Sequence, residues 1–389
     1  MNSARSDLRV GVIGLGLRGH LVDLAHRPGR GARVTALCDL DPEAAARWAH
    51  RVDPAPVVTV DYRELLTSVD AVLVATPDHT HEQIVVDALR AGVATFAEKP
   101  LAITTPGCDR ILATAMETGT RLYVGHNMRH FAMVRAMKQL IDDGAIGEPQ
   151  TVWCRHFVAH GGDYYFKDWH AQRRHVTGLL LHKGAHDIDI IHWLAGGVSR
   201  RVSAVGRLAV YDRVTDRHDG TKRADWFDER HWPPLNQTGL HPEIDIEDVS
   251  LMQMELDNGV LASYQECHFS PDYWRNYTVI GTEGRIENFG DTDGVVRIWN
   301  RRGGFREFGD HQVPFRSTEG GHGGADTRLM DEFLRFAREG GPTDTSPVSA
   351  REAVAAGCAA TVSLRHGGGS VQVSPPNPTV ARYFAGHQV

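Results

Sequence analysis

The first third of the chain alternates short apolar runs with segments whose apolar residues recur at helical spacing. An apolar run at residues 8–13 leads through a glycine-rich turn into a helical pattern at 20–27, and a second apolar run follows at 32–41. This order predicts a βαβ unit. The alternation then continues, with strands predicted over 69–77, 93–100 and 121–127 and helices over 81–92 and 104–118. Repeated βα units predict a doubly wound parallel sheet.

The pattern changes after about residue 148. Strand-like runs at 249–256, 259–269 and 276–290 follow one another with turn residues and no helices between them. Such a succession predicts a large open, mainly antiparallel sheet. A chain of 389 residues is long for one hydrophobic core. We therefore predict an α/β protein with one domain over 1–127 and a C-terminal α+β domain over 128–389.

The turn after the first strand reads GLGLRG and has GxGxxG spacing. Gly14 permits the tight turn, Gly16 lets the backbone approach a pyrophosphate, and Gly19 allows a helix and a strand to pack closely. The start of the following helix then faces the anion. The first domain is therefore predicted to be a dinucleotide-binding Rossmann domain.

Asp39 closes the predicted βαβ unit twenty residues after Gly19. Its carboxylate can accept hydrogen bonds from ribose hydroxyls and would repel a ribose 2′-phosphate, and no arginine follows directly. We expect NAD rather than NADP as cofactor. The alternative is that Asp39 only caps the helix that begins near Pro42, although Asp41 is the better placed cap.

Composition excludes several classes of protein. The net charge is −7 with histidine neutral, and lysine and arginine are scattered, which excludes a nucleic-acid-binding surface. The five cysteines are far apart and lack CxxC spacing, which favours reduced thiols over disulfides or structural zinc. Because no signal peptide or membrane-spanning stretch is found, we expect a cytoplasmic protein without a membrane partner.

Five motifs occur in order along nearly the whole chain: GVIGLGLRG, ATPDHTH, EKP at 98–100, GHNMRHF at 125–131 and GTEGRIE at 281–287. With these motifs the sequence resembles the Gfo/Idh/MocA family of NAD(P)-dependent oxidoreductases that act on CH–OH groups. The resemblance implies a C-terminal α/β domain whose open sheet forms one face of the substrate cleft. It also implies that helices at about 325–360 pack back near the first domain, and that the protein is a homodimer or homotetramer.

The glycine motif and the resemblance together predict a set of cofactor-binding residues. They are Gly14, Gly16, Leu17, Arg18, Gly19, Asp39, Thr76, Pro77, His81, Glu98, Lys99 and Asn127.

The resemblance also assigns the catalytic chemistry. Lys99 takes the position of the EKP lysine, whose cation stabilises alkoxide character on the substrate oxygen, although it could instead only pair with a local carboxylate. In the segment GLLLHKGAH, His186 takes the catalytic histidine position and can exchange the hydroxyl proton near neutral pH. His182, the third predicted catalytic residue, stands where an aspartate is usual, and Lys183 follows it.

Helical spacing sorts the remaining polar groups of this segment. Residues 182, 186 and 189 share one helix face, so Asp189 either orients His186 or caps a neighbouring backbone group, whereas Asp187 and His192 are predicted to be structural. The spacing of His182 and His186 also fits two metal ligands. We predict no metal, since no HExxH glutamate is present and nicotinamide chemistry already uses both histidines.

The segment 153–175 interleaves aromatic rings with hydrogen-bond donors, which is typical of carbohydrate clefts. The alternative is a solvated loop with core aromatics. The polar stretch 212–248 is too long for an ordinary connection and could be a substrate lid or an oligomer arm. The predicted substrate-binding residues are Lys99, Arg129, Tyr164, Trp169, Arg173, His182 and His186, with Arg174 as a further candidate.

The sequence thus predicts hydride transfer between NAD and a secondary hydroxyl of a sugar, glycoside or cyclitol. The first alternative is a glycosidase that uses bound NAD for transient oxidation and elimination. The second, from a different class, is a nucleotide-binding sensor or assembly protein without catalysis.

Overall fold

A computed structural model describes residues 6–219 and 227–388, which divide into two compact units. Unit 1 contains residues up to His130, Thr318–Arg351 and the C-terminal segment from Pro376. Unit 2 contains Phe131–Ser317 and Glu352–Pro375. The domain limits 1–127 and 128–389 stay a prediction.

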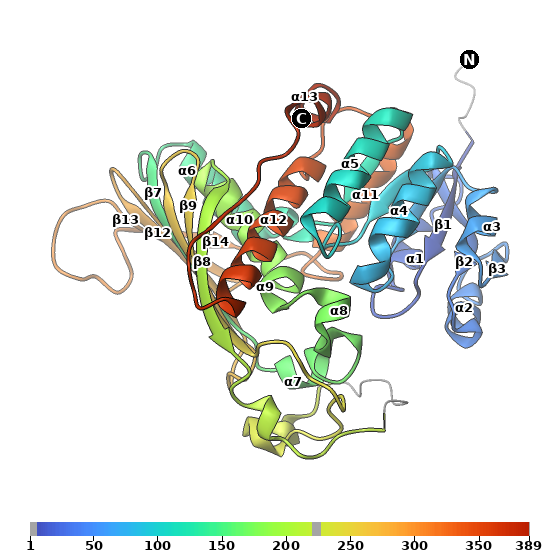
Figure 1. Cartoon of the computed structure of the whole chain (residues 1–389). Coiled ribbons are helices and arrows are strands. Elements are labelled where there is room, and N and C mark those ends of the chain that lie inside the picture. The colour runs from blue at the N-terminus through green and yellow to red at the C-terminus, as the bar shows by residue number, and fades with distance from the viewer. Residues whose placement is uncertain (1–5, 220–226, 389) are drawn as a thin grey trace. The chain divides into compact units, whose positions relative to one another are not determined.

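Unit 1 is built on a six-stranded parallel sheet with the strand order β3-β2-β1-β4-β5-β6, which is the doubly wound order and confirms the predicted fold class. Its strands are β1 (Leu8–Ile13), β2 (Ala32–Cys38), β3 (Val57–Thr59), β4 (Ala71–Val74), β5 (Ala94–Ala97) and β6 (Leu122–Val124). Its helices are α1 (Leu21–Ala25), α2 (Pro42–Ala49), α3 (Tyr62–Leu66), α4 (His81–Arg90), α5 (Thr105–Thr118), α11 (Ala325–Glu339) and α13 (Pro378–His387). The helices α4 and α5 lie side by side (Figure 1).

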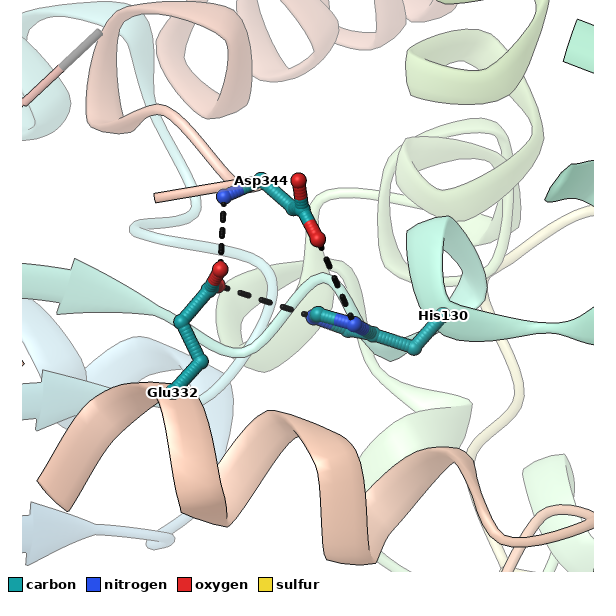
Figure 2. Close-up of side chains that lie close together, drawn as sticks. All are labelled: His130, Glu332 and Asp344. Carbon is teal, nitrogen blue, oxygen red and sulfur yellow. Dashed lines mark hydrogen bonds and ion pairs between the residues drawn. The ribbon is translucent and has the colours of Figure 1, made fainter. Parts of the chain in front are cut away.

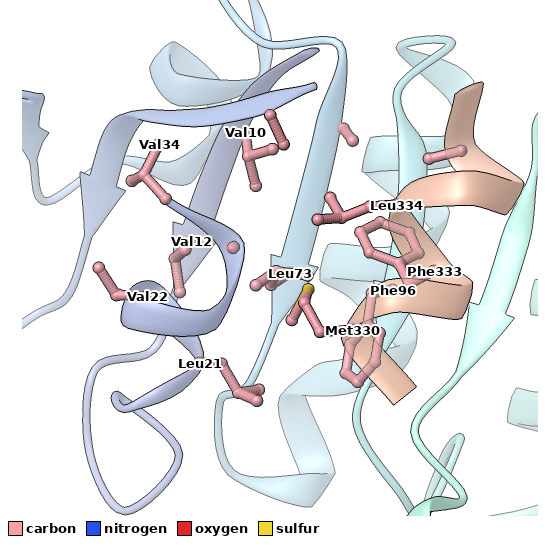
Figure 3. Packing of buried hydrophobic residues seen from close by; sticks show 14 of the residues in the cluster. Val10, Val12, Leu21, Val22, Val34, Leu73, Phe96, Met330, Phe333 and Leu334 are labelled. Atoms are coloured by element: carbon pink, nitrogen blue, oxygen red, sulfur yellow. The ribbon is translucent and has the colours of Figure 1, made fainter. Parts of the chain in front are cut away.

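The first strand shows how its alternating residues divide the core between two faces of the sheet. Val10 and Val12 are fully buried in the cluster that also holds Met330 and Phe333 of α11, as Figure 3 shows. Gly11 faces the other way, and a Cβ there would collide with Leu65 of α3. Since successive side chains of a strand point to opposite faces, this one strand requires a helix on each side.

Local capping sets the helix limits that the sequence pattern left open. The Asp41 side chain accepts a hydrogen bond from the Glu43 N–H at 3.0 Å and caps α2, so Asp41 and not Asp39 is the cap. Thr104 caps α5 in the same way, and the helix ends at Gly119 with φ +64°. The first helix is shorter than the 20–27 pattern predicts and covers Leu21–Ala25 only.

Unit 2 is built on a nine-stranded sheet with the order β14-β13-β12-β11-β7-β10-β9-β8-β15. Every pair is antiparallel except β7 with β10. Its strands are β7 (Pro149–Phe157), β8 (Ser199–Arg207), β9 (Val249–Leu256), β10 (Leu261–Cys267), β11 (Trp274–Gly281), β12 (Arg285–Phe289), β13 (Gly294–Trp299), β14 (His311–Phe315) and β15 (Val371–Gln372). The predicted run 276–290 is a hairpin of two of these strands, closed by the Gly281 N–H donating to the Gly284 carbonyl at 2.8 Å.

Most helices of unit 2 follow β7 and precede β8 in the chain. The helices are α6 (Ala132–Asp142), α7 (Gly161–Tyr165), α8 (Arg173–Val176), α9 (Leu179–His182) and α10 (Gly184–Ala195), while α12 (Pro347–Arg365) crosses from one unit's residues to the other's. Of these, α10 lies against the sheet (Figure 1). Contacts of α10 with β7 and β10 bury its apolar face on the sheet.

The polar stretch 212–248 forms three short 3₁₀ turns, η4 (Tyr211–Arg213), η5 (Glu229–His231) and η6 (Pro234–Asn236). Its residues 220–226 lie outside the described part of the chain. Among the described residues, no helix combines the length and the hydropathy that a membrane crossing needs.

Candidate active site

The glycine loop after β1 has the geometry that a dinucleotide requires. Gly14 has φ +89°, and a Cβ there would lie 2.6 Å from the Ala75 carbonyl oxygen. A Cβ on Gly16 would meet no atom within 4 Å, which leaves the backbone open to an approaching phosphate. A Cβ on Gly19 would collide with the indole of Trp48, so the close approach is to a side chain of α2 rather than to a strand.

Asp39 lies at the end of β2 beside this loop. Its Oδ2 accepts the Leu15 N–H at 2.7 Å, and its Oδ1 accepts the Asp41 N–H at 2.8 Å. Each carboxylate oxygen keeps further acceptor capacity that a ribose hydroxyl can use. These contacts hold the carboxylate in place and fit the predicted ribose-binding role.

Arg18, predicted to contact the cofactor, is held by two carboxylates. Its Nε donates to Glu98 Oε1 at 2.6 Å, and its Nη1 and Nη2 donate to the two oxygens of Asp326 at 2.9 and 3.1 Å. The guanidinium therefore ties the glycine loop to the end of β5 and to α11. Burial alone would lower its pKa, but the two carboxylates raise it above its usual value.

Asp326 is the centre of this network and was not identified from the sequence. Besides Arg18, it receives Asn127 Nδ2 at 3.0 Å and faces His20 Nε2 at 3.0 Å and His322 Nδ1 at 2.8 Å. Burial by itself would raise the pKa of Asp326, but the histidine contacts and the guanidinium hold it well below its usual range. The available signal was the run GGHGGAD at 320–326, in which Gly320, Gly323 and Gly324 have positive φ angles just before α11.

His81, a predicted cofactor-binding residue, is almost fully buried. Its Nε2 faces the Thr76 carbonyl at 2.8 Å and its Nδ1 faces the Pro100 carbonyl at 2.7 Å. It thereby joins the turn at Thr76 and Pro77 to the EKP segment. The Lys99 N–H donates to Glu98 Oε2 at 3.0 Å, which fixes the backbone that carries the predicted catalytic lysine.

Arg129, a predicted substrate-binding residue, is buried and donates to the Asp344 carbonyl at 2.9 Å. The neighbouring His130 lies between two carboxylates (Figure 2). Its Nε2 is 3.7 Å from Glu332, and its Nδ1 is 3.9 Å from Asp344. Both distances are longer than a hydrogen bond, and the three side chains lie close enough together to offer one ligand atom each to a metal ion, so the absence of a metal stays a prediction.

In unit 2 the predicted catalytic segment is divided between α9, which ends at His182, and α10, which contains His186. Only Lys183 interrupts the helix, and its backbone keeps α-helical angles. Burial lowers the pKa of the Lys183 ammonium, whose Nζ lies 5.7 Å from the centroid of the Tyr165 ring.

The His182 ring is packed among aromatic rings of the 153–175 segment. Ring centroids lie 4.8 Å away for His170, 5.7 Å for Tyr165 and 5.9 Å for Trp169, all in edge-to-face arrangements. The structure therefore brings two predicted site residues, Trp169 and His182, into contact.

Tyr164 belongs to a neighbouring ring group. Its ring is 4.7 Å from that of His160, which stacks on Tyr273 at 5.4 Å and also meets Phe227. Burial, with a smaller contribution from Lys183, lowers the pKa of His160 to about 4. The sequence pattern did not predict His160 or His170 as site residues, although both lie in the 153–175 segment that is typical of a carbohydrate cleft.

The two arginines of α8 are engaged by side chains of unit 2. Arg173 Nη2 lies 3.3 Å from Glu247, which also binds Arg365 at 2.9 Å through each oxygen. Arg174 donates to the Gln172 side chain at 2.8 Å.

Asp187 and His192 have the structural roles that their helix face suggests. Fully buried Asp187 contacts Arg275 and His156 at 2.9 and 3.0 Å and accepts from two tyrosine hydroxyls. Burial alone would raise the pKa of Asp187, but Arg275 and the hydrogen bonds hold it far below its usual value. His192 Nε2 accepts the Ser199 N–H at 3.1 Å.

Comparison with known families supports the interpretation of both units. Residues 8–126 match the family model described as the oxidoreductase family NAD-binding Rossmann fold, and residues 138–373 match the model of the same family's C-terminal alpha/beta domain.

Several similar proteins are named as dehydrogenases. An inositol 2-dehydrogenase of Burkholderia multivorans is 37% identical over 223 residues, an alignment that covers 56% of this chain and only 61% of that protein. A levoglucosan dehydrogenase in complex with NADH and levoglucosan has a similar structure, with a TM-score of 0.74, 22% identity, and coverage of 95% of this chain and all of that one. A myo-inositol 2-dehydrogenase from Lactobacillus plantarum gives a TM-score of 0.72 at 18% identity, with coverage of 95% and 100%. At these identities the two structures establish the shared fold.

Proposed function

Because this chain belongs to the Gfo/Idh/MocA oxidoreductase family, with its NAD-binding Rossmann domain, we propose that it catalyses reversible oxidation of a secondary hydroxyl on a sugar, glycoside or cyclitol. The observation that carries the proposal is the nucleotide cradle of unit 1. In its glycine loop, Gly16 leaves the backbone open to a phosphate, and the neighbouring Leu15 N–H donates to the Asp39 carboxylate. The aromatic and histidine side chains of unit 2 support a polyol substrate, since rings cover sugar C–H faces and imidazoles bind hydroxyls.

The residues of this chain handle the substrate oxygen and its proton. When bound, nicotinamide supplies the hydride acceptor. The Lys99 ammonium donates a hydrogen bond to the substrate oxygen and stabilises the negative charge that grows there. His186 accepts the hydroxyl proton during oxidation and returns it during reduction, and His182 hydrogen-bonds the same hydroxyl.

The cofactor in this proposal is NAD rather than NADP. Asp39 places a carboxylate beside the glycine loop, where a ribose 2′-phosphate would meet a like charge. Arg18 does not offset this charge, because Glu98 and Asp326 occupy its guanidinium.

We also propose that the protein assembles as a homodimer or homotetramer through the open face of the nine-stranded sheet. Trp153, Leu261, Leu251 and Val205 are exposed on four adjacent strands, and their register places them on one face. A second copy of this face is a matching apolar partner. Light scattering after size-exclusion chromatography tests the assembly, and a monomer at micromolar concentration would refute it.

The catalytic proposal is tested by following NADH absorbance while sugars, glycosides and inositols are offered with NAD or NADP. We expect steady NADH production from at least one polyol and a preference for NAD. Release of an aglycone without net NADH would instead identify the glycosidase.

Variants test the residue roles. Lys99→Ala and His186→Ala should each lower kcat by about 100-fold or more while the protein still binds NADH. Lys138→Ala and His366→Ala are matched controls because Lys138 pairs with Asp142 on α6 and His366 is exposed. If the site variants keep full biological activity, the protein is a sensor rather than an enzyme.

A further inference from the structure

Asp168 and His170 form a close pair in the turn that precedes α8. The carboxylate Oδ1 accepts the His170 backbone N–H at 3.0 Å and lies 2.5 Å from Nδ1 of the same residue. The two contacts place the ring proton of His170 on Nδ1, since a carboxylate only accepts hydrogen bonds. The second ring nitrogen, Nε2, therefore lies on the edge opposite Asp168.

Three rings hold the His170 imidazole in one orientation. Trp169 stacks on it with a centroid distance of 3.7 Å, Tyr165 meets it at 5.7 Å, and the His182 ring lies at 4.8 Å with an angle of 74° between the planes. The His170 side chain is only 6% exposed. Because it cannot turn without breaking this packing, the direction of its ring is set by the fold.

The Asp168 carboxylate interacts electrostatically with both histidines. His170 and, more weakly, His182 help to lower the pKa of Asp168 against the opposing effect of burial. Attraction between two groups is mutual, so the Asp168 carboxylate favours the protonated form of His182 as well. The titratable groups around His182 include Asp168, His170 and Tyr165, with Lys183 next to it in the chain.

We propose that Asp168 and His170 are positioning residues that orient His182 and stabilise its protonated form. The inference rests on the proposed function, in which His182 hydrogen-bonds the substrate hydroxyl. During oxidation the hydroxyl proton moves from the substrate oxygen to His186, while the protonated His182 ring, stabilised by the Asp168–His170 pair, donates a hydrogen bond to the same oxygen as negative charge grows there. In reduction His186 returns the proton to the oxygen, and His182 keeps its hydrogen bond.

A spectroscopic test needs neither substrate nor cofactor. Protein labelled with ¹⁵N in histidine is titrated by NMR, and the His170 and His182 signals are assigned from the spectra of His170→Phe and His182→Gln. In Asp168→Asn we expect the strongly deshielded His170 Nδ1 proton to disappear and the titration midpoint of His182 to move to lower pH. An unchanged His182 midpoint would overturn the proposal.

Kinetics of the holoenzyme provide the second test. Asp168→Asn should lower kcat about tenfold with a KM change of about twofold or less, and Asp168→Glu should restore part of the loss. The matched control is Asp61→Asn, because Asp61 is also an aspartate cap, accepts the Arg63 N–H at 2.9 Å at the start of α3, and lies outside the predicted site. This control should keep the activity of the unaltered protein.

The outcomes separate the inference from the function on which it rests. If Asp168→Asn and the control variant lose the same activity and the His182 midpoint stays constant, Asp168 is only a turn cap and the inference is wrong. If no polyol yields NADH with the unaltered protein, the proposed function fails. The NMR titration then still decides whether Asp168 acts on His182.

Discussion

Replacing Asp326 by asparagine tests the network that anchors the glycine loop. The side chain of Asp326 is fully buried and contacts Arg18, His20, His322 and Asn127 at 2.8–3.1 Å. Asparagine has the same shape but lacks the negative charge, so Arg18 loses one of its two buried counter-charges. Breaking a buried ion pair by removing one partner costs about 3–5 kcal/mol.

We expect the lower end of this range, about 3 kcal/mol, because Glu98 continues to pair with Arg18. For a unit of this size, that loss corresponds to a decrease in Tm of about 6–12 °C. The assay is thermal unfolding followed by circular dichroism, together with NADH binding measured by fluorescence. Weaker NADH binding should accompany the lower Tm, since Arg18 holds the loop that approaches the pyrophosphate.

Asp331→Asn is the control on the same helix. Asp331 pairs with Arg27, but its side chain is 54% exposed, so solvent screens the pair and its loss should cost about 1 kcal/mol or less. If the two variants lower the Tm equally, burial does not make the Asp326 network special and the reasoning is refuted.

Three further predictions concern the loop, the cofactor and the pH dependence of stability. Gly14→Ala should weaken NADH binding by roughly tenfold or more, because φ +89° is strained for alanine and its Cβ would lie 2.6 Å from the Ala75 oxygen. Titration with NADH measures the affinity, and an unchanged affinity would contradict this prediction. Asp39→Ser should shift the ratio of kcat/KM values toward NADP by about tenfold or more, and an unshifted ratio would remove Asp39 from cofactor selection. Burial lowers the pKa of His160 to about 4. As the pH falls from about 6.5 to 4, the unfolded chain therefore binds a proton on this histidine and the folded protein does not. Urea unfolding should show the free energy of unfolding falling by about 2 kcal/mol over that interval from this group, because solvent screens a ring that is only partly buried. His160→Phe, which keeps the stack on Tyr273, should reduce this slope.

The sequence predicted correctly those local features that depend on residues close together in the chain. The conformation of Gly14 and the Asp41 helix cap depend on residues within a few positions, and both features are found. The order of strands in unit 1 follows from repeated βα units, whose handedness leaves few alternatives. The roles of Lys99, His186 and the other site residues stay predictions.

Long-range partners could not be predicted in the same way. Arg18 and Asp326 are 308 positions apart, and no local pattern connects a glycine-loop arginine to the first turn of α11. The reason that Gly19 must be glycine is the Trp48 indole, which reaches it only once α2 has docked.

By itself, the sequence determined the alternation of strands and helices, the nucleotide-binding turn and the family to which the chain belongs, because these depend on local spacing and residue type. Only the tertiary structure decided which charged groups are paired and which rings surround His182. Burial and distance set the strength of those contacts, and both arise when segments far apart in the sequence pack together.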